Sequence, residues 1–328
     1  MKCLVVAKSM DNPATRYRLA PVVQQLRDRG DAVTLIYEPG FFSQLRLITR
    51  AAGCDLIFIQ RKLMNSIIIW LLARIATHVV FDHDDAIFLK SSGRPSSTRN
   101  VRYRTIVQAS RLVLAGNEYL CQAAAAQGGQ VEIVPTSVDV DHYRAVNKSE
   151  KLTLVWIGSR STSRYLEQHK EVLAIIADRM PSIRFRVVGD FQFSVAGLDV
   201  ECINWSEAVE SDALASAHIG IAPMIDDPWT RGKCALKIIQ YMAAGLPVIS
   251  SNVGANKEVV RDGETGFLVD SLGDWCAAIE KLKNSEELRS AMGAAGRKTV
   301  EEHYSQEAIA ARVVSLIDNI SASKISTA

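Results

Sequence analysis

Residues 231–250, RGKCALKIIQYMAAGLPVIS, hold the pattern that decides the fold. Their spacing predicts a helix from about Lys233 to Gly245, because apolar side chains recur at helical intervals on one face. These side chains are Leu236, Ile239 and Met242. The apolar run Val248 to Ser250 follows this helix and predicts a buried strand. A helix that leads into a buried strand is the repeating unit of an α/β protein.

The same alternation continues on both sides of this stretch. Further short apolar runs predict strands at Cys3 to Ala7, Val33 to Ile36, Leu56 to Ile59, Val79 to Phe81, Leu112 to Ala115, Val131 to Val134, Leu152 to Ile157, Ile183 to Val188, Val200 to Ile203 and Ile219 to Ala222. Helical patterns separate these runs, and the clearest extends from Arg16 to Arg29. Alternation of this kind produces parallel sheets covered by helices on both faces.

The polar segment Arg144 to Lys151 divides the chain into two such series. We therefore expect an α/β protein with two doubly wound parallel-sheet domains, at residues 1–148 and 149–304. Residues 305–328 are expected to form a last helix and a polar tail. Parallel sheets bind ligands at the carboxyl ends of their strands, so we expect the site in a cleft between the two domains.

The composition is that of an ordinary globular protein. The chain has 328 residues, of which 48% are apolar and 23% charged, which excludes a disordered, collagen-like or coiled-coil chain. The six cysteines form no C-x-x-C pair, so neither a zinc site nor a disulfide framework is expected. A cytoplasmic protein is expected, because no secretory signal is present and no apolar run reaches the roughly 20 residues of a membrane span.

Positive charge is concentrated in the first half of the chain. Residues 1–148 carry 19 Lys and Arg against 12 Asp and Glu, whereas residues 149–328 carry 19 against 24. The first half therefore has a net charge of +7, which suits an anionic ligand, an anionic membrane surface or nucleic acid. Scattered, solvated arginines are the alternative interpretation.

Three cations lie near the predicted helix start: Arg231, Lys233 and Lys237. The spacing places Lys233, Lys237 and Gln240 on one face of the helix. Cations at a helix N-terminus oppose the helix dipole, so we expect a negative group to bind there. A diphosphate fits, because backbone N–H groups, the dipole and the three cations all favour it. An exposed basic helix start is the alternative.

Two other groups of charged residues follow strands of the first domain. Asp82, His83, Asp84 and Asp85 come directly after the run Val79 to Phe81, and such a cluster is costly unless it has a function. Arg16 and Arg18 lie in the first turn of the first long helix, where they again oppose the dipole. We expect these two arginines to bind a charged acceptor or a donor phosphate across the cleft, with solvent-facing side chains as the alternative.

The stretch from Lys237 to Val269, KIIQYMAAGLPVISSNVGANKEVVRDGETGFLV, resembles the signature of the retaining GT-B glycosyltransferases of family 4. The segments WIGS at residues 156–159 and GIAPM at residues 220–224 are similar to the second domain of that family. The resemblance implies two Rossmann-like domains that face a central cleft, with a nucleotide-diphosphate sugar on the second and an acceptor on the first. It also implies a final helix that crosses back to the first domain.

The resemblance places donor-binding residues in the strand-end loops of the second domain. They are Gly158, Ser159, Arg160, Gly189, Asp190 and Trp205, together with Arg231, Lys233, Lys237 and Gln240. The family usually carries a Glu-x7-Glu pair, whose first member lies near the donor sugar and whose second binds the ribose. The matching positions here are Gly232 and Gln240. Gln240 retains the ability to bond a ribose hydroxyl, more weakly than a carboxylate does.

Catalytic roles follow from the same resemblance, since family members often place a His-Asp pair near the strand end where Asp84 lies. We expect Asp84, His83 or Asp82 to orient or deprotonate the acceptor hydroxyl. Arg231 and Lys237 are expected to stabilise the leaving diphosphate without a metal or other cofactor. A rival interpretation is a divalent metal site at Asp82 and Asp84, which form the D-x-D motif of the unrelated GT-A glycosyltransferases. The third interpretation is that one of these aspartates caps the next helix.

The sequence therefore predicts a glycosyltransferase in cell-surface polysaccharide or glycolipid assembly. Its expected partners are a nucleotide-sugar donor, a sugar or lipid-linked acceptor and, from the charge, an anionic membrane surface at the inner face; no nucleic acid is expected. A catalytically silent GT-B protein that binds a nucleotide is the alternative, because both family glutamates are absent. A sugar-nucleotide epimerase, which needs no acceptor, is a third hypothesis. No G-x-G-x-x-G or P-loop motif occurs, which disfavours a dehydrogenase or P-loop enzyme.

Overall fold

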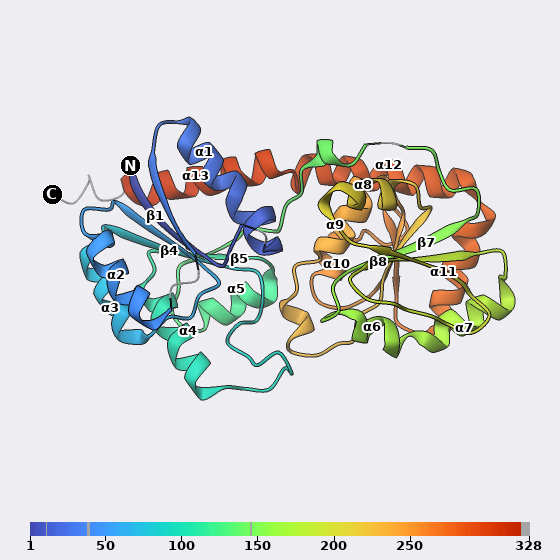
Figure 1. Cartoon of the computed structure of the whole chain (residues 1–328), viewed down its shortest axis with the longest axis horizontal. Helices are drawn as coiled ribbons and strands as arrows, with labels where there is room; N and C mark the ends of the chain where they lie inside the picture. The colour runs from blue at the N-terminus through green and yellow to red at the C-terminus, as the bar shows by residue number, and fades with distance from the viewer. Residues whose placement is uncertain (11, 38–39, 145, 323–328) are drawn as a thin grey trace. The chain divides into compact units, whose positions relative to one another are not determined.

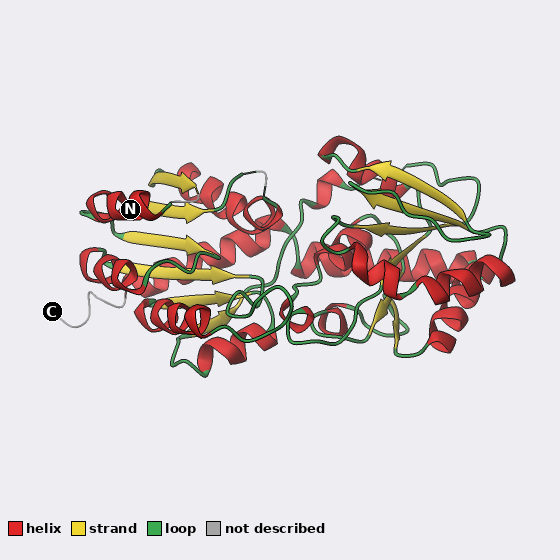
Figure 2. Ribbon diagram, turned by 60° about the horizontal axis from the view of Figure 1, so that its bottom comes forward, coloured by secondary structure: helices red, strands yellow, loops and turns green. Residues whose placement is uncertain are grey.

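Six strands of the first half of the chain form one parallel sheet in the order β2-β1-β3-β4-β5-β6. Their bounds are β1 Lys2–Ala7, β2 Ala32–Tyr37, β3 Leu56–Gln60, β4 His78–His83, β5 Leu112–Ala115 and β6 Val131–Ile133. The computed structural model describes residues 1–10, 12–37, 40–144 and 146–322. Figure 2 shows the strands of this sheet side by side and pointing the same way.

A second parallel sheet has the order β12-β11-β10-β7-β8-β9. Its strands are β7 Thr153–Ile157, β8 Arg184–Gly189, β9 Asp199–Asn204, β10 Ile219–Ala222, β11 Val248–Ser251 and β12 Gly266–Val269. The strand order reverses between β7 and β10 here, and between β1 and β3 in the first sheet. Ligands of doubly wound sheets bind at the carboxyl ends of the strands at such reversal points.

These two sheets confirm the predicted α/β class. Every run predicted as a strand is one, and the bounds differ by two residues at most. One strand was not predicted from the sequence: β12, whose residues Gly266–Val269 lie at the edge of the second sheet. This strand follows a turn in which Leu268 N donates to Asp262 Oδ1 at 2.8 Å.

The chain divides into two compact units. Unit 1 comprises Met1–Ser137, Asp227–Cys234 and Gln306–Ala328, and unit 2 comprises Val138–Asp226 and Ala235–Ser305. The structure thus changes units at Ser137 and not at the expected residue 148. It also places the short segment Asp227–Cys234, which was expected in the second domain, in unit 1. The last helix belongs to unit 1 because its apolar residues enter that core.

Successive side chains of the unit 1 strands point to opposite faces of the sheet, and apolar side chains pack against helices on both faces. Leu4 and Val6 pack on one face against helices α2, α3, α4 and α5, whereas Val5 packs on the other against α1 and α13. Figure 1 shows α1 and α13 together on the side opposite α2, α3 and α4. The bounds are α1 Ala20–Asp28, α2 Phe41–Ala51, α3 Ser66–Ile75, α4 Ser97–Ala109, α5 Glu118–Ala125 and α13 Gln306–Ala322.

Unit 2 has its own core between the sheet and helices α7 and α11. Leu154 and Trp156 of β7 contact apolar residues of both helices, among them Leu173 and Ile279. The helices are α6 Ser163–Gln168, α7 Lys170–Arg179, α8 Glu207–Ala215, α9 Leu236–Ala243, α10 Asn256–Val259, α11 Leu272–Asn284 and α12 Glu286–His303, with a short 3-10 helix at Val140–His142. Within the described part of the chain, no helix has both the length and the apolar character needed to cross a bilayer.

Candidate active site

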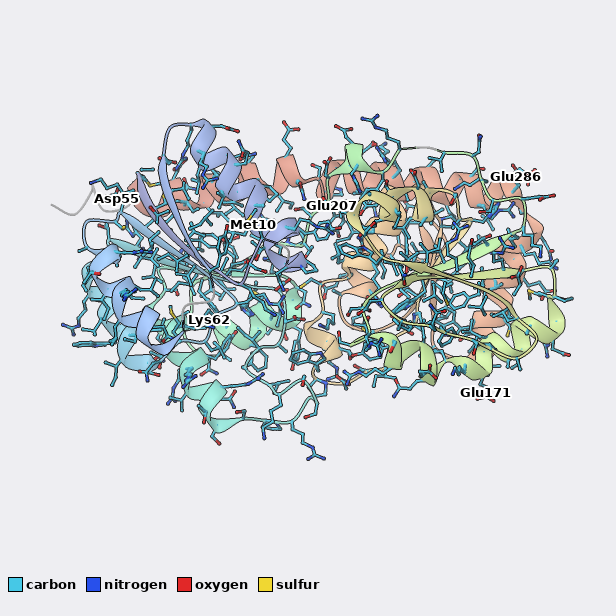
Figure 3. All side chains as sticks on the ribbon, viewed as in Figure 1. Met10, Asp55, Lys62, Glu171, Glu207 and Glu286 are labelled. Atoms are coloured by element: carbon cyan, nitrogen blue, oxygen red, sulfur yellow. The ribbon has the colours of Figure 1, made fainter. Side chains whose placement is uncertain are left out.

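In unit 1, polar side chains gather at the carboxyl ends of β3 and β4. Figure 3 labels Asp55 before β3 and Lys62 after it, which marks the direction of the strand. Asp82 on β4 is buried and pairs with Arg18: Nη2 lies 2.5 Å from Oδ1, and Nε donates to Oδ2 at 3.3 Å. Arg18 Nη1 also donates to the carbonyl of Val134 at 2.8 Å. This is a buried, two-point ion pair whose charges are shielded from water.

Arg18 reaches Asp82 because the first helix begins as a π-helical turn, Thr15–Leu19, and not as the regular helix that the sequence predicted. Thr15 Oγ1 donates to Gln60 Oε1 at 2.9 Å, which ties this turn to the end of β3. Arg16 lies nearer the surface, where its Nη2 donates to the Tyr17 hydroxyl at 2.7 Å. The structure therefore separates the two arginines, because Arg18 is buried against Asp82 and Arg16 is not. Acceptor binding stays a prediction, and Arg16 fits that role better.

Asp84 and Asp85 follow β4 and each faces a cation. Arg61 Nε lies 3.1 Å from Asp84 Oδ1, and the same guanidinium also pairs with Asp85. Lys233 Nζ lies 2.7 Å from Asp85 Oδ1. Burial favours the neutral form of Asp84, but the charges of Arg61, Arg18 and Lys233 outweigh it and lower its pKa below the ordinary value. Asp84 Oδ1 is buried and accepts no hydrogen bond from the described residues.

His83 is enclosed in the core of unit 1. It lies within β4, which extends beyond the predicted strand end at Phe81, and its ring is fully buried. The ring stacks on Phe81 at 5.2 Å between centroids, and Nε2 lies 3.4 Å from the Tyr103 hydroxyl. Burial lowers the pKa of His83 to about 4, so the ring is neutral at pH 7. This position leaves no open ring atom for an acceptor hydroxyl.

The segment Asp227–Cys234 packs against these aspartates. Asn117, which caps α5, donates from Nδ2 to the carbonyls of Arg231 at 3.0 Å and Lys233 at 2.8 Å. Gly232 lies so close to the chain that an added Cβ would be 2.6 Å from Ala86 Cβ and 2.7 Å from Ala86 N. The glycine at this first family-glutamate position is therefore required by the packing of unit 1.

The predicted helix start near Lys233 is wrong. Residues Thr230–Gly232 form a 3-10 turn, and α9 begins only at Leu236 after Ala235, whose φ of 52° breaks the helical path. Lys233 and Lys237 therefore do not share a helix face. Lys233 pairs with Asp85 in unit 1, whereas Lys237 lies in the first turn of α9 in unit 2. The Arg231 side chain is exposed on the 3-10 turn.

In unit 2, Lys237 lies at the carboxyl end of β7, beside the point where the strand order reverses. Its Nζ is 3.8 Å from the centre of the Trp156 ring and 3.4 Å from Thr162 Oγ1. A Cβ on Gly158 would be 2.5 Å from Nζ, so the glycine makes room for the ammonium group. Trp156 Nε1 is buried and has no hydrogen-bond partner among the described residues.

The loops after β7 and β8 are joined by Arg160 and Asp190. Arg160 N donates to Asp190 Oδ1 at 2.8 Å, and its guanidinium donates to the Asp190 carbonyl at 3.2 Å. A Cβ on Gly189 would be 2.5 Å from the carbonyl of Gly158, so these two loops approach closely only because Gly189 lacks a side chain. Ser159 Oγ lies 2.8 Å from Ser161 Oγ in the same loop. The structure thus brings together two of the strand-end loops in which donor-binding residues were predicted.

Gln240 belongs to a buried network that was not predicted from the sequence. Its Nε2 donates to Glu210 Oε1 at 2.8 Å and to the Tyr143 hydroxyl at 3.2 Å. Trp205 Nε1 donates to Glu210 Oε2 at 2.6 Å, and Tyr143 donates to Oε1 at 2.7 Å. Glu210 is 2% exposed although it lies in the first turn of α8, where a glutamate is ordinarily a surface residue. Nothing in the sequence indicates that Glu210 is buried.

The two carboxylates of the D-x-D motif are each committed to an arginine. Among the residues that the structure describes, no group of three or more His, Cys, Asp or Glu side chains has a geometry that could hold a metal ion. What remains chemically available is a cation with glycine loops at the end of β7 and the partly exposed carboxylate of Asp84 after β4. The first arrangement suits an anionic group, and the second suits hydrogen-bond donors such as hydroxyls.

Comparison with known proteins relates the chain to one family. Residues 151–285 match the family described as Glycosyl transferases group 1. A GDP-mannose-dependent alpha-(1-6)-phosphatidylinositol monomannoside mannosyltransferase of Mycobacterium tuberculosis is 28% identical over 216 residues, which cover 57% of this chain and 55% of that protein. The chain thus spans about half the length of the curated relatives it matches.

Solved structures share the fold over nearly the whole chain. A sucrose-phosphate synthase from Thermosynechococcus elongatus superimposes with a TM-score of 0.77 at 15% identity, covering 98% of this chain and 100% of that one. HepE from Anabaena, in complex with UDP and glucose, gives a TM-score of 0.72 at 14% identity, with 97% and 100% covered. At these identities the likeness establishes the two-domain GT-B fold.

Proposed function

We propose that this chain transfers a sugar from a nucleotide-diphosphate sugar to a hydroxyl acceptor, because residues 151–285 match the group 1 family of glycosyl transferases. Cell-surface polysaccharide or glycolipid assembly is the proposed setting, since the relative from Mycobacterium tuberculosis is named as a mannosyltransferase that acts on phosphatidylinositol monomannoside. A cytoplasmic site of action is part of this proposal. The observation that carries it is the position of Lys237 beside Gly158 in unit 2.

Lys237 supports binding of the donor diphosphate on three grounds. Its ammonium group lies at the carboxyl end of β7, where a doubly wound sheet of this order binds nucleotides. It lies in the first turn of α9, whose dipole also attracts an anion. Gly158 leaves room for this ammonium group, and Gly189 lets the two strand-end loops lie close together beside it. We assign the diphosphate to Lys237 and Arg160, because both lie beside the glycine loops of unit 2, whereas Lys233 lies against Asp85 in unit 1.

On the acceptor side, Asp84 is the residue best suited to contact a hydroxyl. It is ionised because the neighbouring cations lower its pKa, and its side chain, 13% exposed, is the least buried of the carboxylates at this strand end that pair with Arg18 or Arg61. A carboxylate with a lowered pKa is a weak base, so Asp84 is assigned to orient the hydroxyl by accepting its hydrogen bond, and the hydroxyl proton passes to the departing diphosphate, which is the stronger base. Asp82 positions Arg18, and His83 supports the end of β4 from within the core.

The proposed mechanism stabilises the leaving diphosphate electrostatically. The cation Lys237 and the N-terminus of α9 favour the transition state over the ground state, because the charge on the leaving group grows as the glycosidic bond breaks. No metal is needed for this step, so turnover should continue in excess EDTA. Complete loss in EDTA with recovery in Mn²⁺ would contradict this part of the proposal.

Nucleotide binding tests the proposal directly. Thermal-shift measurements with UDP, GDP, ADP and CMP identify the base, since a ligand at 100 times its Kd stabilises a protein by about 2.7 kcal/mol. For the nucleotide that binds, Lys237→Ala should weaken binding by about 1.5–3 kcal/mol, the range of a charge-assisted hydrogen bond. Lys257→Ala, which removes an exposed lysine of the same unit, serves as the matched control. Equal calorimetric affinities of the two variants would overturn the role of Lys237.

A catalytically silent nucleotide-binding protein is the second candidate, and the absence of both family glutamates favours it. Gly232 has no space for a side chain, and Gln240 donates its amide to Glu210. Incubation with a panel of nucleotide sugars and candidate acceptors separates the two functions. Release of nucleotide that depends on the acceptor supports the transferase, whereas tight nucleotide binding without release supports the silent protein.

A further inference from the structure

Helices α2, α3 and α4 of unit 1 expose large apolar side chains and arginines that do not pack into the core. We call the exposed side chains Leu45, Arg46, Arg50, Ile67, Trp70 and Arg74 the three-helix face. These six side chains lie on α2 and α3, and α4 packs beside α3. None of them belongs to the candidate active site described above.

The three helices are neighbours on one side of the sheet. Asn65, the N-cap of α3, donates its backbone N–H to Gln44 Oε1 of α2 at 3.4 Å. Thr105 of α4 donates from Oγ1 to Ser66 Oγ of α3 at 3.1 Å. Figure 1 shows the three helices together on the side away from α1 and α13. Their exposed side chains therefore form one continuous surface.

Large apolar side chains are concentrated on this surface. The described part of the chain has ten exposed large apolar side chains, and five of them lie on α2, α3 or α4. Ile67 is 67% exposed and Trp70 is 52% exposed, although both belong to a helix whose other side fills the core. Their spacing of three residues, with Arg74 four further on, places them on the same outer stripe of α3.

The charge on these helices is of one sign. The segments α2, α3 and α4 contain six arginines and not one Asp or Glu. The sequence has no acidic residue between Asp55 and Asp82, and none between Asp85 and Glu118. The surplus of positive charge in the first half of the chain is thus located on this side of unit 1. The guanidinium of Arg74 lies 4.2 Å from the centre of the Trp70 ring, so that an apolar ring and a cation are presented together.

We propose that the three-helix face binds the surface of an anionic lipid bilayer. Arginines attract anionic headgroups, tryptophan favours the boundary between headgroups and acyl chains, and exposed Ile and Leu gain free energy when they leave water. The exposed apolar side chains lie among arginines of the same helices, which fits a fluid lipid surface better than a folded protein partner. Nucleic acid would pair with the arginines but would leave Ile67 and Leu45 in water.

Vesicle flotation of the full chain tests this proposal. We expect binding to vesicles that contain phosphatidylglycerol, weaker binding as salt increases, and little binding to phosphatidylcholine alone. Arg46→Gln combined with Arg50→Gln should lower the partition coefficient about 25-fold, because each cation near the surface contributes about fivefold. Trp70→Ala should lower it further without affecting the fold, because the side chain is half exposed and alanine favours the helix.

Matched variants on unit 2 distinguish this face from general surface charge. Lys257→Gln combined with Lys298→Gln removes the same charge from exposed positions, and Leu272→Ser removes an exposed apolar side chain. These variants should bind vesicles as the unaltered chain does. Equal losses in both sets, or no binding to either vesicle, would overturn the proposal. So would a concentration-dependent dimer, or RNA binding, that Trp70→Ala or the double arginine variant abolishes while vesicle binding stays unchanged.

Flotation does not depend on the proposed transferase activity. A variant of the three-helix face that no longer floats should still bind the nucleotide and turn over a water-soluble acceptor. Conversely, Lys237→Ala should bind vesicles as the unaltered chain does, although it binds the nucleotide more weakly. The two proposals therefore fail separately.

Discussion

Replacing Gly232 by alanine tests how the segment Asp227–Cys234 is held on unit 1. The added Cβ would lie 2.6 Å from Ala86 Cβ and 2.7 Å from Ala86 N, and contacts this short are strongly repulsive. Because one of these contacts is with backbone, a rotamer change cannot relieve it. Either the segment or the turn that contains Asp85 and Ala86 has to move.

The expected cost follows from the contacts on both sides of Gly232. Forcing one methyl group into a filled site costs about 1–3 kcal/mol. If the segment moves away, Asp85 loses Lys233 but keeps Arg61, so the further loss is below about 1 kcal/mol. Units of this size lose about 2–4 °C of Tm for each kcal/mol, so a total cost of about 1–4 kcal/mol gives a fall of roughly 2–16 °C.

Thermal unfolding followed by circular dichroism measures this effect. Gly273→Ala is the matched control, because its nearest neighbour, Ser271 Oγ, would lie 3.7 Å from the new Cβ in helix α11. That variant should be as stable as the unaltered chain, or slightly more so. Adding Ala86→Gly to Gly232→Ala removes one of the two short contacts and should restore part of the loss. Equal melting temperatures for Gly232→Ala and Gly273→Ala would refute the reasoning.

Three further predictions concern stability. Asp82→Asn leaves the charge of Arg18 buried without its counterion and should cost about 3–5 kcal/mol in urea unfolding, so an unchanged midpoint would contradict the buried pair. Truncation before Ser305 removes α13 from the core of unit 1 and should abolish cooperative unfolding, whereas removing only residues 321–328 should leave the melting curve nearly unchanged. Because the pKa of His83 falls from 6.5 to about 4 on folding, the unfolded chain binds the extra proton, and stability should decrease as pH falls from 6.5 to 4. The same decrease in His83→Gln would show that other groups cause it.

The sheets were predictable because burial leaves a local pattern. Parallel strands covered on both faces are short, nearly continuous apolar runs, and these were found for every strand except β12. That strand begins at Gly266 and contains only four residues, of which two are half-buried. The start of α9 was misplaced because Ala235 adopts a left-handed conformation, which is uncommon for a residue with a side chain. Nothing in the local sequence indicates it.

The candidate site was predicted less well, because ion pairs between distant segments decide it. Lys233 and Asp85 are 148 positions apart in the sequence, yet Lys233 Nζ lies 2.7 Å from Asp85 Oδ1. Charge and helix periodicity alone grouped Lys233 with Lys237, and only the tertiary structure separates them. The loops at Gly158 and Asp190 were found because glycine and polar residues directly after a predicted strand are a local signal.

The change from glutamate to glutamine at position 240 also has a physical reason. Gln240 Nε2 lies 2.8 Å from Glu210 Oε1, and both side chains are buried. A glutamate at this position would place two carboxylates in contact away from water, and one of them would have to take up a proton. The amide instead donates a hydrogen bond to Glu210, as the Tyr143 hydroxyl and the Trp205 indole also do. The absence of the family carboxylate at 240 and the buried Glu210 therefore belong to one arrangement, in which the carboxyl group lies on α8 and not on α9.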